Sequence, residues 1–331
     1  MTTRGLVIGK FYPPHRGHKL LIDTALAHAD EVHVIVCDRP GEDPPATLRQ
    51  QWLQEIHPNA TIWRIDDRYD ADDSAVWAEN CVKWLGFTPD VVFTSENYGD
   101  RFAACMGCKH VLVDQARQQL PVSGTAVRTD PLGNWEFLEP PVRGHYAKRV
   151  VLIGAESTGK TTLATDLAEA LGTIWLPEFG REYWEAKMAR GEPNTWRTEE
   201  FAEIAQEQCR REEAAARLAN RVLICDTDAF STRVWHHRYM NVWSPEVDAI
   251  AENHRRPDLY LLTDVKTPFV QDGTRDGETI REWMHATFEA ELKADARPFV
   301  AMKGSRSERL AAALEAIRRS RSHQQPNLAP P

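Results

Sequence analysis

The residues best suited to chemistry form a glycine-bounded loop, GAESTGKT, at positions 154–161. The loop matches G-x-x-x-x-G-K-[ST] in full and lies between an apolar run and a helical pattern, as a phosphate-binding P-loop requires. Its backbone N–H groups would surround an anion, and the following helix N-terminus would add positive potential. We expect Lys160 to reach the β- and γ-phosphates of ATP and the Thr161 hydroxyl to bind Mg²⁺. The residues expected to contact ATP are Gly154, Ala155, Glu156, Ser157, Thr158, Gly159, Lys160, Thr161 and Thr162.

Carboxylates follow two of the apolar runs in the same half of the chain. Asp226 and Asp228 come after the run at 222–225, where a P-loop site needs an acid beside the metal. We expect one of them to bind Mg²⁺ and the other to cap the next helix, and the choice depends on strand register. Glu178 follows the run at 173–176 and can accept a proton or bind a ribose hydroxyl. The three acids therefore compete for the role of general base.

Basic side chains lie close to these acids. Arg181 can neutralise a transferring phosphoryl group, or it can form a surface ion pair with Glu182. The segment 269–277 is polar and contains glycine hinges, so we expect it to close over ATP. Arg275 and Arg281 are its cationic candidates, and a solvated surface loop is the alternative.

A different phosphate site is indicated near the start of the chain, in the sequence GKFYPPHRGH at 9–18. His15 and His18 precede and open a helical pattern, so they can donate hydrogen bonds to one phosphate chain, and Gly17 permits close backbone approach. A His-x-x-His pair can also bind zinc, but no cluster of cysteines or carboxylates stands near it in the sequence. Phosphate binding is the interpretation that we prefer.

The elements that must position these residues alternate between strands and helices. Such alternation predicts an α/β fold with mostly parallel sheets. The pattern stops in a segment rich in proline and glycine and then begins again, which indicates two tandem domains, each with its own sheet. The expected strands are 6–8, 32–37, 61–65, 91–93 and 111–113, then 149–153, 173–176, 222–225, 259–262 and 299–302. The expected domains are a Rossmann-like domain at 1–130, a linker at 131–147, a P-loop domain at 148–319 and a flexible tail at 320–331.

Composition excludes several classes of protein. The 331 residues include 40 basic and 49 acidic side chains, a formal charge of −9, which argues against coating nucleic acid or an anionic membrane. No run approaches the roughly 18 apolar residues of a membrane span, and the first residues lack a secretory signal. Six irregularly spaced cysteines, including Cys105 and Cys108, indicate free thiols rather than a disulfide framework. We expect a cytoplasmic protein whose oligomeric state the sequence leaves open.

Two motifs carry a resemblance to a known superfamily. The segment 9–18 resembles the G-x-F-x-P-x-H-x-G-H signature of the nucleotidyltransferase superfamily of adenylyl and cytidylyl transferases. The sequence PVSGTAVR at 121–128 is similar to the second motif of that superfamily. The resemblance implies that His15 and His18 hold ATP phosphates in the transition state and that Ser123, Thr125 and Arg128 bind the triphosphate. It also implies contributions to the ATP site from Gly9, Lys10, Phe11 and Gly17.

The order of the two domains resembles the NadR-type family, which joins an adenylyltransferase to a ribosylnicotinamide kinase. PEFGREY at 177–183 and ICDTD at 224–228 add to this resemblance, which extends from Gly5 to about Arg319. It implies phosphorylation of nicotinamide riboside by ATP in the second domain. It further implies adenylyl transfer from ATP to nicotinamide mononucleotide in the first, giving NAD and pyrophosphate. Enteric members begin with a helix-turn-helix domain that does not precede the first strand here, so we do not expect DNA binding.

Two other functions fit the same motifs. One is a phosphopantetheine adenylyltransferase fused to a dephospho-coenzyme A kinase, and the other is a sensor that binds ATP and NAD without turnover. A cationic pyridinium ring favours an aromatic face, which would support the nicotinamide interpretation. The tryptophans considered for that face are Trp175 and Trp184 in the second domain and Trp52 and Trp84 in the first.

Overall fold

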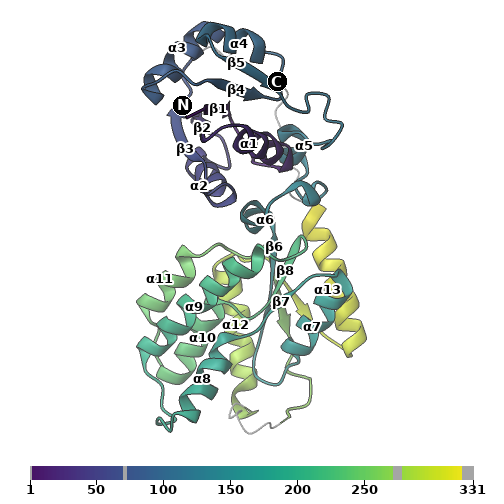
Figure 1. The fold of residues 1–331 in the computed structure, drawn as a ribbon. Coiled ribbons are helices and arrows are strands. Elements are labelled where there is room, and N and C mark those ends of the chain that lie inside the picture. Colours follow the sequence, from purple (N-terminus) through teal and green to yellow (C-terminus); the bar gives the residue numbers. More distant parts are fainter. Residues whose placement is uncertain (1, 70–72, 271–277, 323–331) are drawn as a thin grey trace. The chain divides into compact units, whose positions relative to one another are not determined.

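The computed structural model describes residues 2–69, 73–270 and 278–322. The chain divides into two compact units, residues 1–143 and 144–331 (Figure 1). Each unit contains one parallel five-stranded sheet with helices on both faces, which confirms the expected α/β class. Within the described ranges, no helix has the length and apolar character needed to cross a bilayer.

The first unit has the strand order β3-β2-β1-β4-β5, with β1 at the centre. All five strands lie where the sequence predicts them. The strands are β1 (Arg4–Gly9), β2 (Glu31–Asp38), β3 (Thr61–Asp66), β4 (Val91–Thr94) and β5 (Lys109–Leu112). The helices are α1 (Arg16–His28), α2 (Ala46–Ile56), α3 (Ser74–Leu85), α4 (Gly99–Met106) and α5 (Gly124–Thr129).

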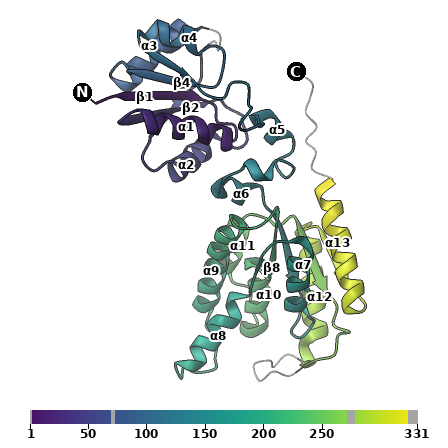
Figure 2. The same cartoon turned by 45° about the vertical axis from the view of Figure 1, so that its right-hand side comes forward.

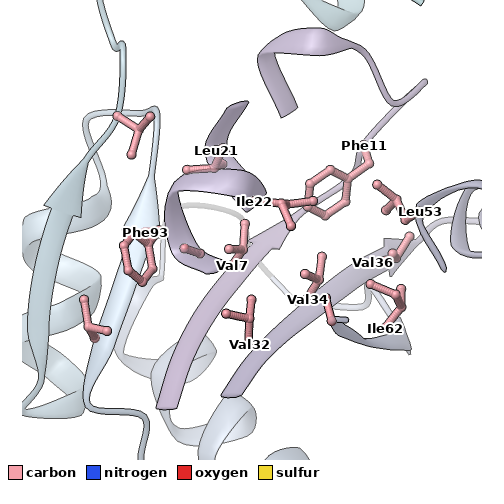
Figure 3. Packing of buried hydrophobic residues seen from close by; sticks show 14 of the residues in the cluster. Val7, Phe11, Leu21, Ile22, Val32, Val34, Val36, Leu53, Ile62 and Phe93 are labelled. Carbon is pink, nitrogen blue, oxygen red and sulfur yellow. The ribbon is translucent and has the colours of Figure 1, made fainter. Parts of the chain in front are cut away.

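The core of this unit lies on both sides of β1. Figure 3 shows Val7 of β1 beside Val34 of β2, with Ile22 of α1 and Phe11 packed above them. Leu6 points to the opposite face and joins the cluster under α3 and α4. Because successive residues of a strand face opposite sides, the run at 6–8 is apolar throughout. This packing fixes α1, whose first residues belong to the histidine motif.

The second unit has the strand order β10-β9-β6-β8-β7, again with the motif-bearing strand at the centre. Helices α7 and α13 pack on one face of the sheet, and α9 to α12 lie on the other (Figure 2). The strands are β6 (Lys148–Ile153), β7 (Trp175–Leu176), β8 (Val222–Asp226), β9 (Leu259–Thr263) and β10 (Phe299–Met302). The helices are α7 (Lys160–Leu171), α8 (Phe179–Ala189), α9 (Thr198–Ala216), α10 (Ala229–Met240), α11 (Pro245–Asn253), α12 (Arg281–Ala294) and α13 (Arg306–Ser322).

The segment 131–147 is not the irregular linker that its prolines and glycines predict. It contains a short 3₁₀ turn, η1 (Trp135–Phe137), and helix α6 (Pro140–Tyr146). Two prolines begin α6 because proline is tolerated in the first helical turn, where its missing N–H has no intrahelical acceptor. Helix α13 also extends past the expected boundary at 319, and the strand expected at 173–176 is only two residues long.

The packing of α1 on β1 predicts a specific loss of stability. Ile22 is fully buried, so Ile22→Ala should destabilise the first unit by about 2–5 kcal/mol through lost apolar contact and a residual cavity. Leu112→Ala is the control, because Leu112 is 48% exposed and its truncation should cost less than about 0.5 kcal/mol. Amide hydrogen exchange of β1 and β2 measures the difference. Equal protection in the two variants would contradict this account of the core.

Candidate active sites in the two units

The first candidate site is formed where β1 turns into α1. His15 is the N-cap of α1, and its Nδ1 accepts a hydrogen bond of 3.1 Å from the backbone N–H of Gly17. The ring of His18 stacks on that of His15, with 3.8 Å between their centroids. Because Nδ1 of a neutral His15 is the acceptor, its Nε2 carries the proton and can donate to a ligand. A Cβ atom on Gly17 would lie 2.9 Å from the His15 ring, so this close packing requires glycine.

Both histidines are held neutral near pH 7. Burial, followed by the positive charges of Arg117 and Arg128, lowers the pKa of His15 to about 4. Burial, followed by His15 and Arg117, places the pKa of His18 well below its ordinary value. Arg117 lies outside both motifs, and no sequence signal identified it as part of this site.

The second motif of this unit, at 121–128, lies beside the histidine motif. Ser123 caps α5 by accepting a hydrogen bond of 3.1 Å from the N–H of Ala126. Arg128 donates to the carbonyl oxygen of Tyr12 and, over 3.0 Å, to the Thr125 hydroxyl. The segments around 9–18 and 121–128, far apart in sequence, are thereby brought together.

Three further residues surround the histidine site: Lys10, Phe11 and Arg49. The sequence analysis did not identify Arg49. The Lys10 ammonium lies 3.1 Å from Glu42, whose other oxygen accepts from Arg49 over 2.6 Å. Arg49 is fully buried on α2 and also donates to the Lys10 carbonyl oxygen. Phe11 is a core residue with its ring edge-on to His18, so its contribution is to packing. Among the described residues, no group of three or more metal-ligating side chains includes His15 or His18.

The second candidate site is the loop between β6 and α7. Lys160 is buried and its ammonium donates to the carbonyl oxygens of Gly154, over 3.0 Å, and Ala155, over 2.9 Å. The Thr158 hydroxyl lies 2.6 Å from that of Thr263 at the end of β9. Gly154 has φ = +144° and leaves no room for a Cβ atom beside Thr263, so only glycine fits. The loop therefore has the shape of an anion-binding turn.

The two aspartates after β8 have different partners. Asp226 accepts a hydrogen bond from Thr161, and its Oδ1 has no hydrogen-bond partner among the described residues. Burial raises the pKa of Asp226, against the opposing effects of Lys160 and Thr161. Asp228 caps α10 through Ser231 and accepts from the Tyr260 hydroxyl over 2.7 Å. Both Asp228 oxygens thus accept hydrogen bonds within the fold, which confirms the expectation that one of the two aspartates caps the next helix. Asp226, beside Thr161, is the better placed candidate for the metal.

Glu178 and Arg181 line a cavity of about 190 Å³ beside the loop. Burial raises the pKa of the Glu178 carboxyl, Asp226 and Glu156 add to the effect, and Lys160 and Arg181 oppose it. The aromatic part of the cavity lining, called the aromatic wall below, comes from α8, α9, α10 and the segment before α9. Its residues are Trp184, Trp196, Phe201, Trp235 and Tyr239.

Of the tryptophans considered from sequence, only Trp184 lines this cavity. Trp175 packs against the core of the second unit, Trp52 is buried, and Trp84 lies in an aromatic cluster of the first unit. Trp196, Trp235 and Tyr239 were missed because no motif includes them. Cys105 and Cys108 are free thiols, as expected.

Two arginines contact carbonyl oxygens of the loop. Arg281 donates to Ser157 over 3.4 Å and to Thr267, beyond β9, over 2.7 Å, and Arg309 donates to Thr158 over 2.8 Å. Arg309 was not expected, because it lies on α13, 151 residues after Thr158. Arg275, the other cationic candidate, lies outside the described residues.

The chain is similar to known proteins both in its second unit and over most of its length. Residues 149–309 match a family model described as an AAA domain. The chain is 30% identical over 295 residues to the trifunctional NAD biosynthesis/regulator protein NadR of Escherichia coli strain K12, which covers 82% of this chain and 72% of that protein. The corresponding protein of Salmonella typhimurium strain LT2 is 29% identical, with 82% and 71% covered.

Solved structures agree with the fold along the whole length. A crystal structure of NadR protein in complex with NR matches with a TM-score of 0.79 and 20% identity, covering 100% of this chain and 99% of that one. A second, in complex with NAD and AMP-PNP, matches with a TM-score of 0.76 and 19% identity over 99% of both chains. The sequence relationship to the Escherichia coli protein and the paired units together show that this chain belongs to the NadR family of NAD biosynthesis proteins.

Proposed function

We propose that this chain catalyses two ATP-dependent reactions, phosphorylation of nicotinamide riboside in the second unit and adenylylation of nicotinamide mononucleotide in the first. The observation that supports the proposal is that each unit places one of the two motifs at the end of its own central strand, before a helix. The NR, NAD and AMP-PNP bound by structural relatives are substrates, products or analogues of these two reactions. The mononucleotide formed by the kinase reaction is the substrate that adenylyl transfer requires, together with a second ATP.

In the kinase reaction, the P-loop binds the triphosphate of ATP. Lys160 exchanges its two loop carbonyl partners for phosphate oxygens, and the backbone N–H groups of the loop neutralise further charge. A magnesium ion suits the Thr161 hydroxyl and Asp226, because both offer oxygen atoms and the Asp226 Oδ1 lacks a partner in the described structure. When bound, that ion would offset charge on the β- and γ-phosphates.

The nucleophile of this step is a ribose 5′-hydroxyl, which must lose its proton. Glu178 is our candidate for the general base, since it lines the cavity and its pKa is raised by burial. Asp228 already accepts from Ser231 and Tyr260, Asp226 accepts from Thr161, and neither is among the residues that line the cavity. Arg181 lines the same cavity and can offset charge on the transferring phosphoryl group. The aromatic wall gives the cationic nicotinamide ring a suitable face.

In the adenylyl transfer, the phosphate of the mononucleotide attacks the α-phosphate of ATP and pyrophosphate leaves. That nucleophile is already ionised, so the first unit needs no general base. His15 and His18 can donate to phosphate oxygens from the N-terminus of α1, while Arg128, Ser123 and Thr125 hold the rest of the triphosphate. Catalysis then rests on position and on charge neutralisation.

The direct experiment supplies nicotinamide riboside and ATP to the purified chain and follows the products by chromatography. We expect nicotinamide mononucleotide first and NAD afterwards, over many turnovers. Tight ATP binding without product would favour a sensor. Consumption of dephospho-coenzyme A in place of the riboside would favour the other bifunctional enzyme.

The two sites should fail separately. Lys160→Ala should lower the kinase rate by about 10²–10³, the usual effect of losing one preorganised charge contact, and leave adenylyl transfer from supplied mononucleotide intact. His18→Ala should do the reverse. The reaction that each variant should spare is its folding control: adenylyl transfer for Lys160→Ala and the kinase reaction for His18→Ala. Loss of both reactions in either folded variant would contradict independent sites.

The depressed pKa of His15 predicts proton uptake on ATP binding. The free imidazole is neutral above about pH 4, and a bound triphosphate favours its charged form and so raises its pKa. Near pH 6, in Lys160→Ala protein, calorimetry in buffers of different ionisation enthalpy should therefore report net proton uptake, which declines toward pH 8.

His15→Asn is the matched control for this uptake. Asparagine is a good N-cap and can still accept from the Gly17 N–H, but it cannot gain a proton at this pH. The uptake should therefore be smaller in this variant. An ATP-binding heat that is independent of the buffer in the parent protein would show that the histidines stay neutral in the complex.

A further inference from the structure

An ion pair crosses the wall of the kinase cavity between the P-loop and α10. The Arg238 guanidinium lies 3.1 Å from the Glu156 carboxylate, and the two side chains are only 6% and 15% exposed. Glu156 lines the cavity, at the third position of the loop. A carboxylate is not a ligand for the anion that such a loop binds, so the place of Glu156 in the cavity lining suits a ligand other than the triphosphate.

The chemistry of a carboxylate limits what that partner can be. A phosphate oxygen would be repelled, whereas a hydroxyl can donate a hydrogen bond to it and a cationic ring would be attracted. A carboxylate can accept about four hydrogen bonds, so its pairing with Arg238 does not prevent contact with a ligand. In the proposed kinase reaction, the ligand that offers hydroxyl groups and a positive ring is the riboside rather than ATP.

Arg238 is itself held by the aromatic wall. Its guanidinium lies 4.4 Å from the ring centroid of Tyr239 and 5.3 Å from that of Trp235, and it is 3.0 Å from the Tyr239 hydroxyl. Both aromatic residues line the cavity, one turn of α10 apart. A planar guanidinium suits this place, because it can lie against rings and donate in its plane at the same time. The P-loop carboxylate is thus fixed relative to the surface that would receive the nucleoside base.

We propose that Glu156 accepts hydrogen bonds from the ribose 2′- and 3′-hydroxyls of the nucleoside, and that Arg238 is the positioning residue that aims it. This inference rests on the proposed kinase function and adds to it the residues that select a riboside. It assigns Glu156 to the nucleoside, while ATP is held by the loop backbone, Lys160 and Thr161.

The test compares nicotinamide riboside with its 2′-deoxy and 3′-deoxy analogues, using kcat/KM for each. The wild-type chain should prefer the riboside over at least one analogue by about 10- to 100-fold, the range expected for a hydrogen bond to a charged group. Glu156→Ala should lose most of that preference and keep the KM for ATP within about threefold, which is less than one such contact.

Arg238 is tested through the same ratio of kcat/KM between the riboside and its deoxy analogues. Arg238→Met should reduce this preference for the riboside and raise the KM for the riboside. Arg238→Lys keeps the charge without the planar fork, so it should restore part of the preference. Arg233→Lys is the matched control: it lies on the same helix and is paired with Asp248 and Glu291 away from the cavity lining. That variant should keep the wild-type preference.

The outcomes separate this inference from the function on which it rests. A wild-type chain that does not phosphorylate the riboside overturns the proposed function, and the inference falls with it. If the wild type is active but Glu156→Ala retains its preference for the riboside, or loses affinity for ATP instead, the function stands and the inference is wrong. An equal effect of the Arg233 and Arg238 changes would show that Arg238 only supports α10.

Discussion

Both candidate sites depend on one backbone constraint, a sharp turn from the central strand of a parallel sheet into the first turn of a helix. The turn aims unpaired backbone N–H groups at one point, and it can do so only where side chains leave room for a ligand. Gly154 fits against Thr263 and Gly17 against the His15 ring, at spacings that a Cβ atom would not tolerate. The buried strands β1 and β6 hold these turns in place, so core packing is part of the phosphate sites.

Both proposed sites need positive potential to bind phosphates, and the two units supply it with different side chains. The second unit keeps a permanent cation, Lys160, whose ammonium is held by two loop carbonyl oxygens. The first unit places neutral imidazoles at the contact point, where burial and, after it, the charge of Arg117 depress both of their pKa values. A neutral donor that can become charged strengthens its hydrogen bond as negative charge gathers on the phosphates, which suits a transition state more than a ground state.

The sequence predicts the parts of this architecture that depend on local pattern. The P-loop, the histidine motif and the run at 121–128 each carry their own turn chemistry, and the strands carry unbroken apolar character. Tertiary packing decides the rest. Asp226 and Asp228 are both plausible ligands until Ser231 and Tyr260 occupy the second one. The cavity wall of Trp196, Trp235 and Tyr239 comes from separate segments that only the folded sheet brings together.

The kinase cavity is lined by side chains of both charges, which suits two different ligands. Lys160 is a permanent cation, whereas Glu156 and Glu178 are carboxylates, and five aromatic side chains line the same space. Lys160 and the loop N–H groups attract an anionic triphosphate, and a carboxylate repels it, while a cationic nucleoside experiences the opposite preferences. Each ligand of the proposed reaction is therefore favoured beside its own counter-charge. Burial raises the pKa of Glu178 and so makes its charged form costly in the empty site, and a bound cationic ligand would offset that cost.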